Sequence, residues 1–187
     1  PGATNLITGI ACSWFDSIPV IHITGQVNSY EKQGSQPGTK KTRQVGFQET
    51  DIVSITKPIT KFSYQLQNPN EIKYILEKAC HIAQSGRPGP VLIDIPMNFQ
   101  KAELKMNKLK SYKILKKNNN KYLSVEVEKV TQLLYRSPRP VILLGGGVKI
   151  SKSEKKLDKL LKKLKIPTVT TWSGVDLIDH KNQIYIG

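Results

Sequence analysis

The chain has 187 residues, 38% of them hydrophobic, and a formal net charge of +15 at pH 7. This length allows one large domain or two small ones, and no apolar run approaches the roughly 20 residues of a membrane span, so we expect a cytoplasmic protein without a membrane partner. The lysines gather in two stretches, 101–121 and 152–165, without the interleaved aromatic residues of a stacking platform, so nucleic acid is an unfavoured partner.

The first half of the sequence alternates between helical and strand patterns. It predicts a helix within residues 3–15 and then a strand at 19–24, whose continuous apolar run is typical of a parallel strand covered on both faces. A polar loop, 28–46, follows the strand, and loops of this length are usually functional or mobile. A short helix at 52–55 and a strand at 59–66 come next.

A capped helix and a buried strand complete this half. Asn68 is the expected cap and Pro69 the first residue of a helix that Gly86 ends. The run from Val91 to Ile95 is short, rich in β-branched and apolar residues, and flanked by prolines on both sides. That pattern predicts a buried strand.

A lysine-rich stretch with few apolar residues, 98–121, predicts a linker. Beyond it the alternation resumes, with helical patterns near 127–134 and 157–164 and strand patterns at 140–144 and 167–171. Helices and strands that take turns are typical of parallel sheets with helices on both faces.

We therefore predict an α/β fold of two partial doubly wound parallel-sheet domains. The first would span residues 1–97 and the second residues 122–187, with the basic linker, 98–121, between them. The sequence begins directly in a helical pattern without a Met, so we expect a piece that starts inside a domain.

Ligands of doubly wound sheets collect at the carboxyl ends of the strands. Three such ends carry glycine or polar side chains: Gly25-Gln26, Gly145-Gly146-Gly147 and Thr171-Trp172. The glycine triplet lies between a strand and a helix, so its backbone amides can approach a pyrophosphate. Glycine in a tight turn is structural about as often, so this pattern alone decides neither interpretation.

The cysteines and histidines form no metal-binding pattern. Cys12 and Cys80 lie on the apolar side of predicted helices, so we expect free, buried thiols in a reducing compartment. His22, His81 and His180 are isolated from one another, and His22 is expected to be a packed, hydrogen-bonded core residue. We predict no metal site within this chain.

Four segments, in this order, resemble acetolactate synthase-type thiamine diphosphate enzymes. They are residues 1–6 (Pro-Gly-Ala-Thr-Asn-Leu), 23–27 (Ile-Thr-Gly-Gln-Val), 47–53 (Phe-Gln-Glu-Thr-Asp-Ile-Val) and 86–96. The resemblance covers nearly the whole chain. Up to residue 96 the chain is similar to the carboxyl-terminal part of the pyrimidine-binding domain, and from about residue 122 it is similar to the first half of the central domain.

The resemblance implies a 2-keto acid decarboxylase or carboligase of branched-chain amino acid biosynthesis. Thiamine diphosphate supplies a thiazolium ylid that adds to a 2-keto acid and accepts electrons while carbon dioxide leaves. The family's active sites form between subunits, so a homodimer or homotetramer is implied. Its activating glutamate would precede Pro1, and its Mg²⁺ site would lie in a domain outside this chain. We therefore expect this piece to be inactive alone.

Five residues match active-site positions of the family. Pro1 and Asn5 match positions near the aminopyrimidine end of the cofactor, although a helix start and cap would also explain them. Gln48 matches a glutamine whose amide faces the reacting centre and can bind a developing oxyanion or the cofactor amine. Gln26 and Phe47 match positions around the substrate pocket, with a core phenylalanine as the alternative for Phe47.

A second set matches positions that contact flavin adenine dinucleotide (FAD) in the members that carry it. These are Arg87, Gly145 to Gly147, and Thr171 with Trp172. Arg87 could pair bidentately with a phosphate, or it could be a solvated turn residue. Several relatives have lost the flavin, so the resemblance leaves this cofactor open.

Departures from the family pattern leave the acceptor substrate open as well. Asn28 stands where a proline is usual, the following loop is roughly ten residues longer than in the family, and Met97 replaces a lysine near the channel mouth. One alternative is a thiamine diphosphate-dependent lyase or hydrolase that acts on a sugar-derived or cyclic diketone. Another, which rests on charge alone, is a basic non-enzymatic polyanion-binding module.

Overall fold

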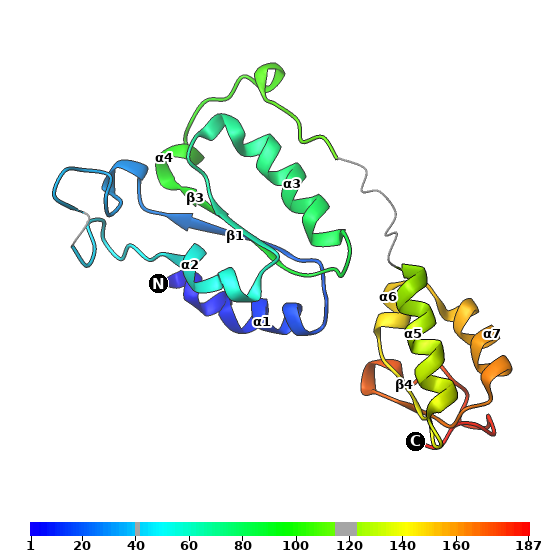
Figure 1. Ribbon diagram of the computed structural model, residues 1–187. Helices are drawn as coiled ribbons and strands as arrows, with labels where there is room; N and C mark the ends of the chain where they lie inside the picture. Colours follow the sequence, from blue (N-terminus) through cyan, green and yellow to red (C-terminus); the bar gives the residue numbers. More distant parts are fainter. Residues whose placement is uncertain (40–41, 115–122) are drawn as a thin grey trace. The chain divides into compact units, whose positions relative to one another are not determined.

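Three parallel strands form the centre of the first half of the molecule: β1 (Ile21–Gln26), β2 (Phe62–Gln65) and β3 (Val91–Pro96) (Figure 1). The computed structural model describes residues 1–39, 42–114 and 123–187. The strands lie in the order β1-β3-β2, so β3 is central. The register pairs Ile21 of β1 with Val91 of β3 and ends with Gln26 beside Pro96.

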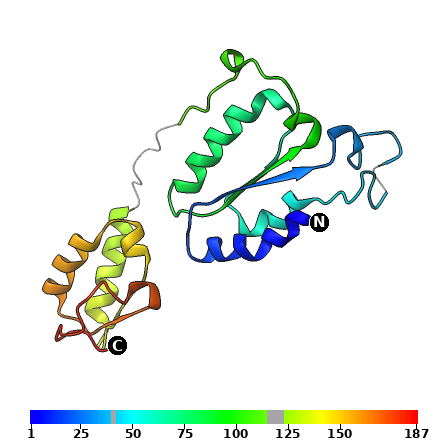
Figure 2. The same ribbon diagram turned by 180° about the vertical axis from the view of Figure 1, so that it is seen from behind.

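Helices cover both faces of this sheet, as Figures 1 and 2 show. On one face α3 (Ile72–Gln84) packs Ile75, Ala79 and Ala83 against Val91 and Ile93. On the other face Ile10 of α1 (Ile7–Phe15) and Ile52 of α2 (Ile52–Thr56) enclose Leu92. Successive side chains of a strand point to opposite faces, so a strand between two helical layers is mostly apolar, as the run from Val91 to Ile93 is. The predicted α/β fold with parallel sheets is confirmed.

The start of α3 follows the predicted capping pattern. A short 3₁₀ turn, η5 (Pro69–Glu71), precedes the helix, and the Asn68 side chain accepts a hydrogen bond of 2.9 Å from the backbone N–H of Asn70. The Glu71 carboxylate accepts one of 3.1 Å from the backbone N–H of Asn68. These bonds satisfy N–H groups that a helix start leaves without partners.

Two expectations about burial are wrong. β1 is an edge strand among the residues that the structure describes, and its Ile23 is 58% exposed, so the strand is not covered on both faces. Cys12 and Cys80 are free, as expected, but exposed. Helical spacing shows which residues share a face, whereas the neighbouring elements decide what covers that face.

The beginning of the predicted linker packs on the first sheet's own helix. After α4 (Met97–Gln100) and η6 (Met106–Lys108), the chain returns along α3, and Leu109 is buried there. The backbone N–H of Tyr112 donates to the Glu77 carboxylate (2.6 Å), and the Tyr112 ring meets Tyr74 edge-on with centroids 5.4 Å apart. Residues 115–121 of the predicted linker lie outside the described residues.

By contact density the chain divides into two units, residues 1–116 and 117–187. Within residues 123–187 the second unit contains five helices and strands and one 3₁₀ turn. They are α5 (Leu123–Arg136), β4 (Ile142–Leu144), α6 (Gly147–Ile150), α7 (Glu154–Leu164), β5 (Thr168–Thr170) and η7 (Trp172–Gly174). β4 and β5 are parallel. The core of this unit consists of Leu157 and Leu161 of α7 packed with Leu144 and Ile178.

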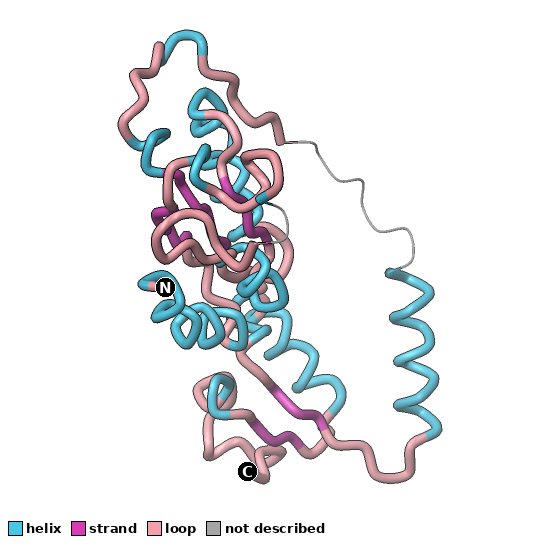
Figure 3. The backbone as a smooth tube through the Cα atoms, turned by 90° about the vertical axis from the view of Figure 1, so that its left-hand side faces the viewer, coloured by secondary structure: helices cyan, strands magenta, loops and turns pink. Residues whose placement is uncertain are grey.

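The amphipathic helix α5 packs on little within its unit. Its apolar residues Val127, Val130 and Leu133 are 56 to 68% exposed, and Figure 3 shows the helix standing apart from the two strands. Leu143, on the face of β4 away from Leu144, is also exposed. None of the helices within residues 1–39, 42–114 and 123–187 is long and apolar enough to cross a membrane.

Candidate functional site

The residues predicted to surround the thiamine cofactor belong to the carboxyl edge of the first sheet. Gln26 ends β1, and the loop that carries Phe47 and Gln48 leads from that end to the start of α2. The helix α1 precedes β1 and runs in the opposite direction to it (Figure 1), so Pro1 and Asn5, at the turn before α1, lie toward the same edge. Ligands of such sheets bind at this edge.

A buried carboxylate, Asp94, is the centre of the polar contacts at this edge. It is fully buried at the end of β3 and accepts hydrogen bonds from three side chains. Thr24 Oγ1 donates at 2.7 Å, Gln65 Nε2 at 2.8 Å and Gln26 Nε2 at 3.2 Å. A buried charge is costly unless such partners surround it.

The glutamine amides connect Asp94 to the long loop, which in the structure spans residues 27–51 between β1 and α2. Gln26 Nε2 also donates to the backbone oxygen of Thr50 (2.7 Å), and Gln26 Oε1 accepts from the backbone N–H of Val27 (3.0 Å). Gln65 Oε1 accepts from the ammonium group of Lys32. Both ends of the loop are therefore fastened at the carboxyl ends of the strands.

Contacts within the loop hold its last segment in place. The Glu49 carboxylate accepts hydrogen bonds from the backbone N–H groups of Gln33 (2.7 Å) and Val45 (3.0 Å). Gly46 lies against Val27, so close that a Cβ atom at residue 46 would be 2.9 Å from the Val27 methyl carbons. Residues 40–41 of this loop lie outside the described residues.

Phe47 and Gln48 occupy the central positions of a turn that the backbone N–H of Glu49 closes on the Gly46 oxygen (3.1 Å). Phe47 is 84% exposed, so the alternative interpretation as a core residue is wrong. Gln48 is exposed and has φ = 58°, in the left-handed region that costs energy for a residue with a side chain. The turn thus presents both side chains to the outside of the first unit.

Pro1 and Asn5 are also exposed. Pro1 precedes the 3₁₀ turn η1 (Gly2–Leu6), and its backbone oxygen accepts from the backbone N–H of Thr4 (3.0 Å). Asn5 lies inside this turn, so it is not a helix cap. A pocket of about 50 Å³ at this edge is lined in part by Gln26 and Lys32, but by neither Pro1 nor Asn5.

Arg87 lies at the opposite, amino edge of the first sheet. Its Nε donates to Ser17 Oγ (2.7 Å), and Nη2 donates to the backbone oxygen of Phe15 at the end of α1 (3.4 Å). Arg87 therefore fastens the turn before β3 to the end of α1. Its predicted phosphate contact stays a prediction.

The remaining predicted flavin positions come together at the carboxyl edge of the second sheet. The backbone N–H of Thr171 donates to Leu144 O (2.8 Å), which brings the turn after β5 against the glycine turn after β4. A Cβ at Gly146 would lie 2.9 Å from the Ser173 Cβ atom. A pocket of about 250 Å³ opens beside Thr171 and Trp172, whose indole is 99% exposed.

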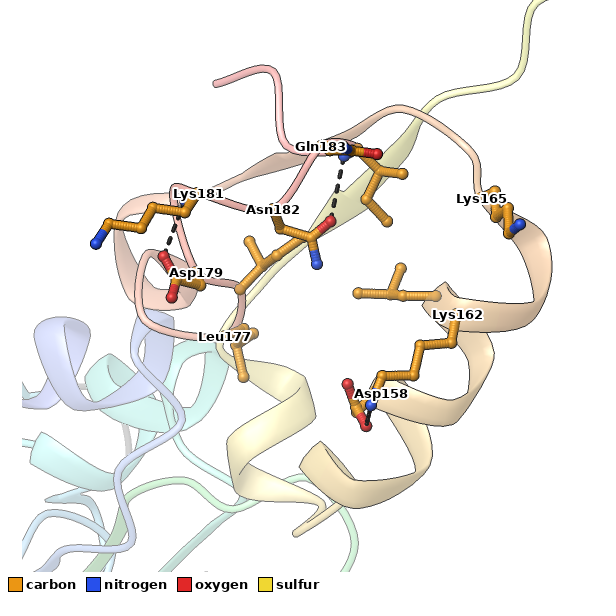
Figure 4. Close-up of a pocket in the computed structure, with 11 residues that line it drawn as sticks. Asp158, Lys162, Lys165, Leu177, Asp179, Lys181, Asn182 and Gln183 are labelled. Carbon is orange, nitrogen blue, oxygen red and sulfur yellow. Dashed lines mark hydrogen bonds and ion pairs between the residues drawn. The ribbon is translucent and has the colours of Figure 1, made fainter.

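A pocket of about 620 Å³ in the second unit contains none of the predicted site residues (Figure 4). It lies between α7 and residues 177–184, with the apolar side chains of Leu161 and Ile178 among its lining. On its charged rim Lys162 pairs with Asp158 at 2.7 Å. Asp179 and Asn182 accept the backbone N–H groups of Lys181 (2.9 Å) and Ile184 (3.2 Å). We assign no chemistry to this pocket.

Sequence reasoning missed the group of residues that builds the first edge, namely Asp94, Gln65, Lys32 and Glu49. One signal was present in the sequence. Asp94 interrupts an otherwise apolar strand, and an aspartate is almost never fully buried unless it is paired. The partners themselves lie 29 to 70 residues away along the chain, and only the fold brings them together.

Two family models match the chain in the expected order. The N-terminal TPP binding domain of thiamine pyrophosphate enzymes matches residues 1–55, and the central domain of thiamine pyrophosphate enzymes matches residues 127–187. The first match includes the turns that carry Pro1, Asn5 and Gln48, and the second includes the glycine turn after β4 and the Thr171 turn after β5.

Curated relatives align over the full chain. The acetolactate synthase large subunit of Cyanidium caldarium is 36% identical over 193 residues, and the probable acetolactate synthase large subunit of Methanocaldococcus jannaschii is 38% identical over 195. The large subunit of acetolactate synthase isozyme 2 of Escherichia coli is 36% identical over 189 residues. Each alignment covers 100% of this chain, and the chain spans 31 to 32% of the length of these relatives.

Proposed function

The chain belongs to the thiamine pyrophosphate enzymes, and on that premise we propose that it forms part of a thiamine diphosphate-dependent 2-keto acid decarboxylase or carboligase of the acetolactate synthase type. One observation carries this proposal. Similarity to acetolactate synthase large subunits runs through all 187 residues, and it includes the segments that meet at the carboxyl edge of the first sheet.

The side chains at this edge suit the aminopyrimidine end of the cofactor. That ring carries both hydrogen-bond donors and acceptors, and the amides of Asn5 and Gln48 offer both kinds of group. Both residues are exposed on the first unit, as expected if a second subunit completes the site. When bound, thiamine diphosphate supplies the carbanion that adds to the keto group of the substrate.

Within this site Gln48 would position the reacting groups, and Phe47 would exclude water beside them. An amide N–H placed next to an oxygen that gains negative charge stabilises that charge more in the transition state than in the ground state. Phe47 offers an apolar surface at the adjacent position of the same turn. Asn5 and Pro1 would hold the ring in place.

The second unit would hold FAD if the intact protein retains it. The glycine turn after β4 approaches the Thr171 turn so closely that side chains at Gly146 would collide with Ser173. A glycine turn has no side chains of its own that would keep a phosphate group away from its backbone amides. Thr171 and the exposed indole of Trp172 line the pocket beside it.

The site of action would be the cytoplasm, within branched-chain amino acid biosynthesis. Both cysteines are free and exposed, and exposed thiols persist in a reducing compartment. A homodimer or homotetramer would bring together sites that one chain leaves open, with Mg²⁺ bound outside the residues of this chain.

Cofactor dependence of the intact protein tests the proposal. We expect consumption of pyruvate only with thiamine diphosphate and Mg²⁺, and a roughly hundredfold lower kcat for Gln48→Ala, which removes one transition-state donor. Gln44→Ala, a change at an exposed glutamine of the same loop, should leave kcat unchanged. Turnover without thiamine diphosphate, or equal kcat values for the two variants, would contradict the proposal.

A further inference from the structure

Asp94 has no part in the chemistry proposed above, although it is the only carboxylate among the described residues that is completely buried. Its three donors come from three different positions: Thr24 and Gln26 on β1, and Gln65 at the end of β2. A carboxylate offers acceptors only, so every group that faces it must be a donor. This requirement fixes the direction of each neighbouring side chain.

The requirement is strictest for the two glutamines. A glutamine amide carries a donor end and an acceptor end, and the two ends point in different directions. Because Nε2 of Gln26 and Nε2 of Gln65 both face Asp94, their oxygens must face away from it. The outward oxygens receive the backbone N–H of Val27 and the ammonium group of Lys32.

These contacts reach both ends of the long loop. Val27 and Lys32 belong to its first segment, residues 27–33. The second hydrogen of Gln26 Nε2 is donated to the oxygen of Thr50, in the last segment, residues 45–50. Thr50 is two residues beyond Gln48, so one amide, oriented by one buried carboxylate, holds the peptide chain beside the predicted catalytic glutamine.

We propose that Asp94 is a positioning residue for the loop: by orienting the amides of Gln26 and Gln65, it fastens residues 27–33 and 45–50 at the carboxyl edge and thereby sets the place of Phe47 and Gln48. The importance of this position for catalysis rests on the proposed function. The fastening itself does not, because it follows from hydrogen bonds within the first unit.

Hydrogen exchange of the full chain, without cofactor or substrate, tests this role. Gln26→Met keeps the length of the side chain and removes its amide, so the amides of segments 27–33 and 45–50 should exchange roughly tenfold faster, the effect of losing about one net hydrogen bond. Exchange in α3 should not change. The matched control is Thr24→Val, which removes a donor to the same carboxylate from a side chain whose hydrogen bond goes to Asp94 and to neither loop segment.

Two further variants complete the test. Asp94→Asn replaces one acceptor by a donor and should also speed exchange in the two loop segments. Lys32→Met should speed exchange only in residues 27–33, and it tests the outer contact even where a change at residue 26 or 94 prevents folding. Unchanged loop exchange in Lys32→Met and Gln26→Met would overturn the proposal. So would Thr24→Val if it loosened the loop as much as Gln26→Met.

The outcome is separable from the proposed function. Faster hydrogen exchange of the two loop segments in Gln26→Met and Asp94→Asn supports the positioning role even in a protein that consumes no 2-keto acid. Conversely, exchange that rises equally throughout the first unit would assign Asp94 to general stability and would leave the cofactor assignment untouched.

Discussion

His22 shows at the scale of one residue how burial makes stability depend on pH. Its Nε2 is buried without a hydrogen-bond partner among the described residues, so the expected hydrogen-bonded core histidine is only partly correct. Burial lowers the pKa of His22 below its ordinary value of 6.5. The unfolded chain therefore takes up a proton at a higher pH than the folded chain does.

The sign of the effect follows from this difference. As pH falls through about 6.5, the unfolded state gains a proton that the folded state does not bind, so the free energy of unfolding decreases. We expect His22→Leu to lose much of this decrease between pH 7 and pH 5, measured by urea denaturation. His180→Gln, at a side chain that is 80% exposed, should retain it, and equal pH slopes for the two variants would contradict this assignment.

The sequence predicts the role of a residue whose contacts lie within a few residues along the chain. It does not predict the role of a residue whose partners are far away in the sequence. Asn68 caps its helix because the cap depends only on the next three residues. Gly145 to Gly147 follow their strand as expected. Asp94 was missed because its donors, Thr24, Gln26 and Gln65, are set by strand order and register, which local patterns do not reveal.

At the scale of elements, the loop after β1 depends on close packing between its two ends. Gly46 contacts Val27 so tightly that an added methyl group would overlap the valine side chain. Gly46→Ala should therefore displace the second segment and increase cleavage of the loop by a protease. The overlap costs energy because a packed valine has little room to move.

A second substitution tests this contact. Val27→Ala removes the methyl groups that the new Cβ would meet, so the double variant Gly46→Ala with Val27→Ala should restore protease resistance to near that of Val27→Ala alone. If the double variant remains as sensitive as Gly46→Ala, contact with Val27 is not what requires glycine at residue 46.

The positions of helices and strands were predicted better than the burial of their apolar faces. Strands at 19–24, 59–66 and 91–95 appear as β1, β2 and β3 with ends shifted by up to three residues. The periodicity of α5 correctly predicts a helix, yet its apolar stripe is exposed. Spacing along a helix depends on the helix alone, but burial depends on a neighbour, and within residues 123–187 little packs on that stripe.

At the scale of the whole molecule, the high net charge and the similarity to acetolactate synthases suggest different functions. The net charge of +15 suggested a polyanion-binding module as one alternative. The similarity to acetolactate synthases instead accounts for the chain from end to end, and the lysines of α7 decorate the exposed side of a helix whose Leu157 and Leu161 are buried. The polyanion-binding alternative stays a prediction that rests on charge alone.

Protection from hydrogen exchange by the cofactor tests most directly whether the carboxyl edge of the first sheet faces thiamine diphosphate. In the intact protein with Mg²⁺, adding thiamine diphosphate should slow exchange in residues 1–6 and 45–50, while α3, on the other face of the sheet, should exchange as before. Cofactor binding that protects other parts of the protein and leaves both of these segments unchanged would contradict the account.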